Sequence, residues 1–103
     1  MRCLLKAEIP VEEGNAGIKD GSLPKTFNSI IEELKPEAAY FLAQNGKRAA
    51  FFFIDMQDPS QLPAVAEPLF LAFNASVEII PVMKPEDLMK AAPAIKKAVN
   101  KYG

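Results

Sequence analysis

The sequence predicts an α+β fold in which a four-stranded antiparallel sheet carries helices on one of its two faces. Three observations lead to this prediction. Four short segments are apolar in the way that strands are, two segments with helical apolar stripes lie between them, and an Asn-Gly pair separates the two middle strands. The resulting order is strand, helix, strand, strand, helix, strand, followed by one more helix at the C-terminal end.

The first strand is predicted over residues 2–9, where apolar side chains alternate with a set that includes Lys6 and Glu8. Pro10 ends this strand because proline cannot donate a hydrogen bond to a neighbouring strand. Residues 11–22 hold three glycines and several charges. We therefore expect them to form a connection or a loose, partly helical lead-in.

The first helix is predicted over residues 23–34, because its apolar side chains recur at the spacing of one helix face. Pro24 allows two interpretations. It lies in the first turn after Ser22, where proline is tolerated, or it kinks a longer helix that starts near Asn15. Pro36 closes the helix.

Two strands joined by a tight turn follow the first helix. The second strand covers residues 38–44, and the third is the segment RAAFFFIDM, residues 48–56. Between them, Asn45 and Gly46 suit a type I′ turn, in which both central residues need a positive φ. The sequence therefore predicts a β-hairpin here.

The second helix is expected to begin near Asp58, because Asp58 and Gln61 resemble a capping box. Its apolar side chains again follow helical spacing. Pro68 is expected to break or kink it, which leaves the segment PLFLAF as a bent apolar tail.

The fourth strand is predicted over residues 76–83, and its Pro81 favours an edge position or a strand end. A last helix opens with proline and two acidic residues after Lys84 and closes with lysines, which suits the helix dipole. Pro93 predicts a kink in its middle. The apolar stripe of this helix consists of Leu88, Ala92, Ile95, Val99 and Tyr102.

This order of elements is the split βαβ, ferredoxin-like arrangement, and the length of 103 residues predicts a single domain over residues 1–103. The net charge of −1 provides no basic excess for a phosphate backbone, so we expect no nucleic-acid partner. No signal-peptide pattern and no apolar run of about 20 residues is present, so we expect no membrane partner. The single cysteine, Cys3, cannot form an intrachain disulfide and fits a cytoplasmic location.

The chain contains no histidine. Nucleophilic sites that need a serine–histidine or cysteine–histidine pair are therefore excluded, and a zinc site of the usual kind is disfavoured. We predict no metal and no cofactor. Cys3 lies in an apolar alternation and is interpreted as a packed thiol, while Asp55 is interpreted as a turn or capping residue.

Consecutive strand residues point to opposite faces, so the strand pattern assigns each side chain to a face. The helices are expected to cover the apolar sets Cys3/Leu5/Ala7/Ile9, Ala39/Phe41/Ala43, Phe52/Ile54/Met56 and Val77/Ile79. The opposite, open face then collects Leu4, Lys6, Glu8, Tyr40, Leu42, Phe51, Phe53, Asp55, Glu78, Ile80 and Val82.

The open face is largely apolar, and large exposed apolar patches usually mark a partner. Three things could cover it: the C-terminal helix, nucleic acid, or the sheet of a second copy. RNA-recognition domains bind RNA on this face with a basic residue, a glycine and aromatics on the third strand and another aromatic on the first. Here KRAAFFFI lacks the glycine and CLLKAEI lacks an aromatic, so the second copy is favoured.

The stretch from AAFFFIDMQDPSQL through EPLFLAFNASVEIIPV is a strand that ends in aspartate, a helix, a Pro-Leu-Phe break and a strand. It is similar to the second half of a muconolactone isomerase subunit. The chain thus resembles the dimeric α+β-barrel superfamily, which also includes YciI-like proteins, antibiotic-biosynthesis monooxygenases and stress-responsive barrel proteins. The resemblance implies a homodimer in which two sheets pack face to face. The histidine–aspartate pair associated with YciI-like proteins cannot be present in this chain, because the chain contains no histidine.

Three charged residues of the open face are candidates for chemistry. Lys6, Glu8 and Glu78 lie on neighbouring strands, so a carboxylate could act as a general base and the lysine could hold an anion. The structural alternative is that Lys6 simply pairs with Glu8 or Glu78. The residues predicted to bind a ligand are Leu4, Lys6, Glu8, Tyr40, Leu42, Phe51, Phe53 and Ile80.

Three functions remain open from the sequence. The first, which we favour, is a dimer that binds a small apolar or aromatic molecule between its sheets, or serves an accessory role, without transforming it. The second is a cofactor-free enzyme of the isomerase or monooxygenase type that uses acid–base residues in the cavity. The third is a purely structural dimer without a cavity.

Overall fold

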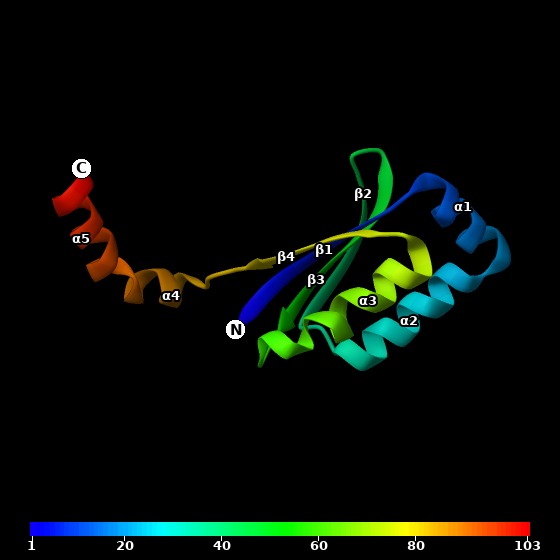
Figure 1. The fold of residues 1–103 in the computed structure, drawn as a ribbon, viewed down its shortest axis with the longest axis horizontal. Helices are drawn as coiled ribbons and strands as arrows, with labels where there is room; N and C mark the ends of the chain where they lie inside the picture. The colour runs from blue at the N-terminus through cyan, green and yellow to red at the C-terminus, as the bar shows by residue number, and fades with distance from the viewer.

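A computed structural model describes all 103 residues and has an α+β architecture. Its four-stranded antiparallel sheet has the order β2-β3-β1-β4, and helices α2 and α3 lie against one face (Figure 1). This arrangement is compatible with the predicted ferredoxin-like fold. The strands are β1 (Arg2–Ile9), β2 (Ala38–Gln44), β3 (Lys47–Asp55) and β4 (Ser76–Pro81). The helices are α1 (Val11–Asp20), α2 (Ser22–Leu34), α3 (Leu62–Phe73), α4 (Pro85–Lys90) and α5 (Ala92–Tyr102), with a 3₁₀ turn η1 (Pro59–Gln61).

The four predicted strands are confirmed, with the fourth ending at Pro81 instead of residue 83, and so is the hairpin between the two middle ones. Asn45 and Gly46 have φ values of 54° and 74°, the positive values that a type I′ turn requires. β4 lies at an edge of the sheet and ends at Pro81. A proline at this position removes no hydrogen bond from a central strand pair.

The lead-in of residues 11–22 is not a loose connection but a regular helix, α1, followed directly by α2. Gly21 separates them with a φ of 81°, which glycine adopts without strain. Gly17 lets the two helices approach, because an added Cβ there would lie only 2.8 Å from the Cβ of Leu23. Pro24 lies in the first turn of α2, so the alternative of a longer, kinked helix is wrong.

The capping box before α3 is confirmed. The side chain of Asp58 accepts a hydrogen bond from the Ser60 amide at 2.8 Å, and that of Gln61 accepts one from the Asp58 amide at 3.2 Å. Of the two predicted effects of Pro68, the break is wrong, because α3 runs through this residue to Phe73, and the kink stays a prediction. The turn beyond the proline is held by burial: Leu69 is fully buried and Phe73 is 3% exposed.

The hydrophobic core lies between the sheet and helices α2 and α3. The helix-facing side chains of β1 are buried, and so are Phe52 and Ile54 on β3. Phe27 of α2 is the centre of an aromatic cluster: its ring lies 5.1 Å from that of Phe73, 5.3 Å from that of Phe41 and 6.2 Å from that of Phe52. The face assigned to the helices from the strand pattern is therefore confirmed for β1, β3 and β4, whereas Ala39, Phe41 and Ala43 on the edge strand β2 are exposed.

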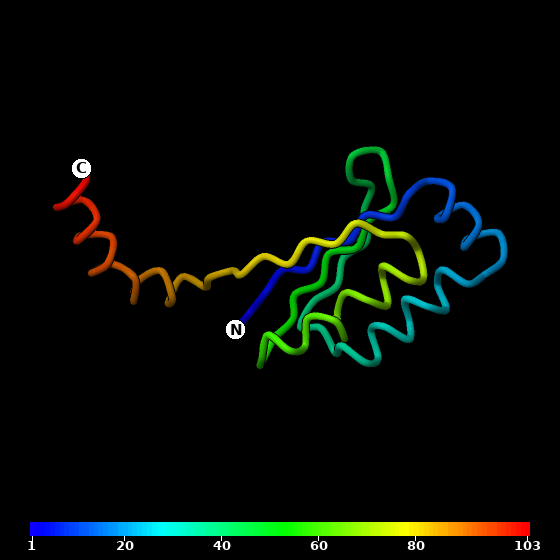
Figure 2. Tube along the Cα trace, in the orientation of Figure 1, coloured from blue at the N-terminus to red at the C-terminus, as the bar shows by residue number.

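The C-terminal segment differs most from expectation. It forms two helices that meet at Ala91, and Pro93 lies in the first turn of α5 rather than in a helix interior. These helices do not cover the sheet. Figures 1 and 2 show them projecting beyond the end of β4, and the molecule measures 57 × 27 × 21 Å as a result. We call residues 83–103 the arm and residues 1–82 the body.

The neighbouring phenylalanines of β3 and β2 give a test of the core. Phe52 is fully buried and Phe41 is 59% exposed. Phe52→Ala should lower the free energy of unfolding by about 3–5 kcal/mol, since it leaves a cavity beside the ring of Phe27 in the core. Phe41→Ala should cost clearly less. Urea denaturation followed by circular dichroism measures both, and equal losses would contradict this description of the core.

Candidate functional site

The register of the strands brings the predicted ligand-binding residues onto the open face of the sheet. Lys6 at the middle of β1 lies opposite Phe51 on β3 and Glu78 on β4, and Tyr40 on β2 continues this row. The adjoining rows repeat the pattern, because strand residues two apart share a face. They contain Phe53, Leu4 and Ile80 on one side, and Leu42 and Glu8 on the other.

This open face is apolar and uncovered. Tyr40 is 59% exposed, and Leu42 and Ile80 are 36% and 38% exposed. Leu4, Phe51 and Phe53 are partly exposed beside them. Neither the helices of the body nor the arm lies over this face.

Lys6 is the one cation at the centre of this face, and it forms no ion pair with a carboxylate in the single chain. Its Nζ lies 5.3 Å from the centre of the Phe51 ring, which is the geometry of a cation–π contact. The only ion pairs in the chain are the Met1 α-amino group with Asp55 and Arg2 with Glu37. The predicted pairing of Lys6 with Glu8 or Glu78 is therefore not formed in the single chain.

The two acidic candidates have different surroundings. The Glu8 carboxylate accepts a hydrogen bond from Asn45 Nδ2 at 3.0 Å, which ties it to the hairpin turn. Glu78 is exposed on the edge strand, opposite Lys6. Their proposed roles as general bases stay predictions.

Ion pairs fix the end of the sheet where β1 begins. The guanidinium of Arg2 donates two hydrogen bonds to the Glu37 carboxylate, at 2.7 and 2.8 Å, across the intervening strand β3. This bidentate contact is the main reason that the pKa of Glu37 is lowered and that of Arg2 is raised. Sequence reasoning missed this pair. The available signal was that Arg2 lies four residues before Lys6 on the same strand, and therefore on the same open face of the sheet.

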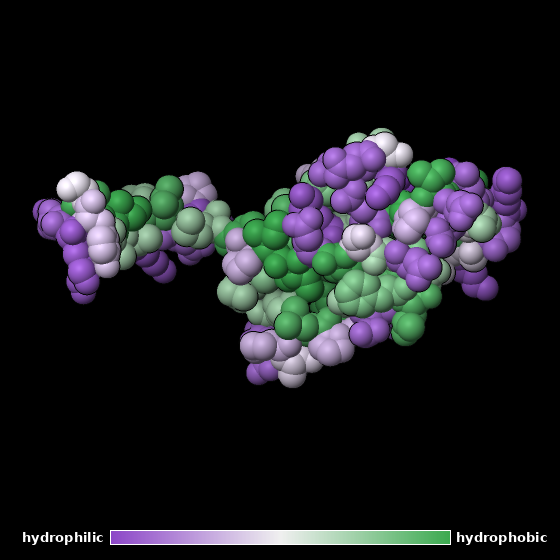
Figure 3. Space-filling view, turned by 45° about the horizontal axis from the view of Figure 1, so that its top comes forward, coloured by the Kyte–Doolittle hydropathy of each residue, from purple (hydrophilic) through white to green (hydrophobic).

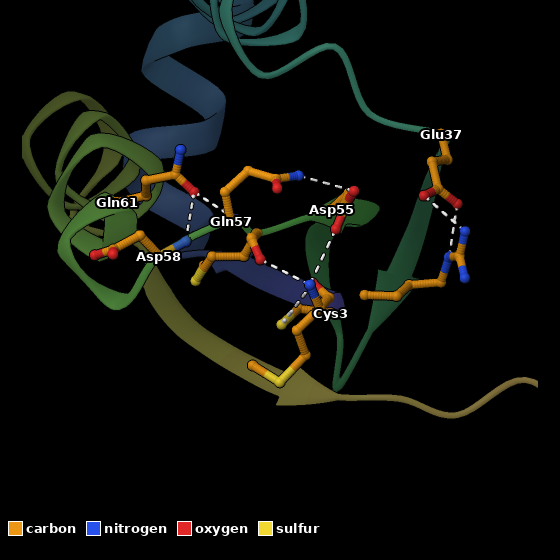
Figure 4. A network of polar contacts seen from close by, with 9 residues as sticks. Cys3, Glu37, Asp55, Gln57, Asp58 and Gln61 are labelled. Carbon is orange, nitrogen blue, oxygen red and sulfur yellow. Dashed lines mark hydrogen bonds and ion pairs between the residues drawn. The ribbon is translucent and has the colours of Figure 1, made fainter. Parts of the chain in front are cut away.

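Asp55 has a structural role, but it neither caps a helix nor closes a turn. Its carboxylate lies 3.1 Å from the Met1 α-amino group and accepts a hydrogen bond from Gln57 Nε2 at 2.9 Å (Figure 4). These hydrogen bonds are the largest causes of its lowered pKa. Cys3 is buried and packed, as expected.

Two cavities are present, and both lie away from the open face. The larger, of about 330 Å³, lies at the outer end of β4 and the start of α3, and we call it the edge cleft. Its apolar lining comes from Met1, Cys3, Met56, Leu62, Ile79 and Pro81. The smaller, of about 190 Å³, lies between α2, α3 and the end of β3. None of the predicted ligand-binding residues lines either cavity, so a pocket at the open face would need a second layer.

The structure contains no group of three acidic, cysteine or histidine side chains that could hold a metal ion. None of the helices combines the length and apolarity needed to cross a membrane. Comparison of the sequence with models of known protein families and with curated proteins finds no match.

The Arg2–Glu37 pair predicts how stability depends on pH. In the folded chain the pKa of Glu37 is below its ordinary value of 4.5. The contribution of this carboxylate to the free energy of unfolding is therefore present above pH 4.5 and is lost as the pH falls toward the lowered pKa. We expect the free energy of unfolding to fall below about pH 4.5, and Glu37→Gln to make the fall shallower. Glu32→Gln, on the exposed surface of α2, should leave the wild-type slope. Urea denaturation at a series of pH values tests this, and identical slopes for all three proteins would contradict it.

Proposed function

We propose that this protein is a homodimer of the dimeric α+β-barrel type, in which two open sheet faces enclose a small aromatic or apolar molecule that carries a negative charge. The role is binding or accessory rather than catalytic. The observation that carries the proposal is the unpaired Lys6 ammonium among the apolar side chains of an uncovered sheet face.

The apolar part of the open face supports the dimer. Leaving this surface in water is unfavourable, since each Å² of apolar area that is removed from water contributes about 25 cal/mol. In the single chain nothing covers it, and the arm, which could have done so, points elsewhere. A second copy brings a surface of the same chemistry, and a two-fold interface matches each residue with its counterpart.

The position of Lys6 supports the charge of the ligand. Placing two copies face to face would bring two Lys6 ammonium groups, neither of which is paired with Glu8 or Glu78 within its own chain, toward the same apolar layer. Burying an unpaired charge is costly, so these groups need an anionic partner. The rings of Phe51 and Tyr40 beside Lys6 suit a flat, aromatic molecule. An aromatic carboxylate or sulfonate satisfies both requirements.

The dimer can be tested on exposed positions of the open face. Tyr40→Glu combined with Ile80→Glu should raise the dimer dissociation constant by at least about 100-fold, because it places four carboxylates in the interface. Val11→Glu combined with Leu71→Glu makes the same change in charge on the helix side, where both residues are exposed, and should leave the dimer intact. Sedimentation equilibrium measures both. A wild-type chain that is monomeric at micromolar concentration would refute the dimer.

Ligand binding can be tested with 1-anilinonaphthalene-8-sulfonate, an aromatic anion whose fluorescence rises on binding. Lys6→Gln should weaken its binding by about 10-fold, since a charge-assisted contact is lost. Lys25→Gln removes the same charge from the exposed surface of α2 and should bind as wild type does. A wild-type dimer that gives no fluorescence change, or equal binding by both variants, would refute the ligand and leave a structural dimer.

A further inference from the structure

The arm presents an apolar helix face that nothing in the chain covers. It continues outward from the end of β4, away from the helices that pack on the sheet (Figures 1 and 2). Every residue of the arm except Ala91 is exposed. On α5, Ile95, Val99 and Tyr102 lie at successive spacings of four and three, which places them on one face. They are 51%, 60% and 78% exposed.

The arm needs a surface to bind. α4 has six residues and α5 has eleven. Isolated helices shorter than about 12–15 residues are marginal in water, because forming the first turn is costly. Helices of this length take most of their stability from the apolar face that they bury.

The body offers a matching surface in the edge cleft. This cleft is the larger of the two cavities and its lining is mainly apolar; Leu62, which is part of that lining, is 41% exposed. Asp58 is also part of the lining. The smaller cavity shares Met56 with the edge cleft and is lined by two further acidic residues, Glu33 and Asp55, of which Asp55 pairs with the Met1 α-amino group. Figure 3 shows apolar surface on the body near the root of the arm and on the arm itself.

The body and the arm carry net charges of opposite sign. The body carries seven basic and eleven acidic side chains, a net charge of −4, whereas the arm carries five lysines and two acidic side chains, a net charge of +3. Lys96, Lys97 and Lys101 lie on α5 outside its apolar face. A basic helix with an apolar face therefore complements an apolar cleft with acidic neighbours.

We propose that the arm of each copy binds in the edge cleft of a second copy, so that two chains exchange arms reciprocally. The arm leads away from its own body (Figures 1 and 2), so we assign it to the same cleft of a second copy. The inference rests on the proposed dimer and adds a second interface to it.

Cross-linking of two differently labelled chains tests the exchange directly. In a Cys3→Ala background, one chain carries Leu62→Cys in the cleft and the other carries Val99→Cys on the apolar face of α5. We expect a short bismaleimide to link the two into a covalent heterodimer after mixing. Asn100→Cys, on the polar face of the same helix, is the matched control and should lose most of this product.

The opposite result would be equally clear. A single chain carrying both Leu62→Cys and Val99→Cys reports whether the arm folds back on its own body. If that chain links only within itself and the mixture gives no heterodimer, the exchange is refuted. Equal heterodimer yields from Val99→Cys and Asn100→Cys would also refute it, because the apolar face would then have no preferred contact.

A pair of charge-matched variants measures the contribution of the apolar face. The first double variant combines Ile95→Glu with Val99→Glu, and the second combines Lys97→Gln with Asn100→Glu. Both change the net charge of the chain by −2 at exposed positions. The first should raise the dimer dissociation constant by at least about 10-fold more than the second, since only the first removes apolar contacts. Equal effects would contradict the docking of this face.

The two proposals fail differently. In one outcome, Tyr40→Glu with Ile80→Glu abolishes the dimer, but no arm cross-link forms and the arm variants leave the dimer dissociation constant unchanged. This outcome refutes the exchange and keeps the sheet-to-sheet dimer. A dimer that depends on the arm alone refutes the sheet-to-sheet interface and keeps the exchange. A wild-type chain that stays monomeric refutes both.

Discussion

The pairing of β1 with β3 on one side and with β4 on the other sets the environment of every side chain in the sheet. Alternate residues of a strand point to opposite faces, so one register divides β1 into a buried set and an open set. Leu5 and Ala7 are fully buried against the helices. Lys6 between them lies on the other face. A shift of one residue would place its ammonium group in the core, which makes the register strongly specified.

The two faces of the sheet have different physical roles. The helix-covered face is closed around the ring of Phe27, which contacts aromatic rings from β2, β3 and α3. The open face has comparable apolar character but no cover, and a lysine sits at its centre beside Phe51. Such a surface, with an ammonium group that forms no ion pair in the single chain, is unfavourable in water and also unfavourable when simply buried. A second copy together with an anionic ligand removes both costs, which is why the proposed function joins them.

The arm also exposes apolar side chains that no other part of the chain covers. Its helices are too short to be stable alone, and their apolar side chains are exposed. The positive charge of the arm and the negative charge of the body nearly cancel, giving the chain its net charge of −1. Composition taken over the whole chain hides this division. Both proposals, the sheet-to-sheet dimer and the exchange of arms, therefore start from an apolar surface that the single chain leaves uncovered.

The sequence by itself determined the four strands, the Asn45–Gly46 turn and the face to which each strand residue belongs, because period-two alternation and turn chemistry are local properties. It also determined which residues would share the open face with Lys6. Only the tertiary structure decided that α3 continues through Pro68, since the burial of Leu69 and Phe73 outweighs the local cost of the proline. It alone showed that Arg2 reaches Glu37 across a strand and that the arm projects from the body. Those features depend on distances between residues far apart in the chain, which local patterns do not encode.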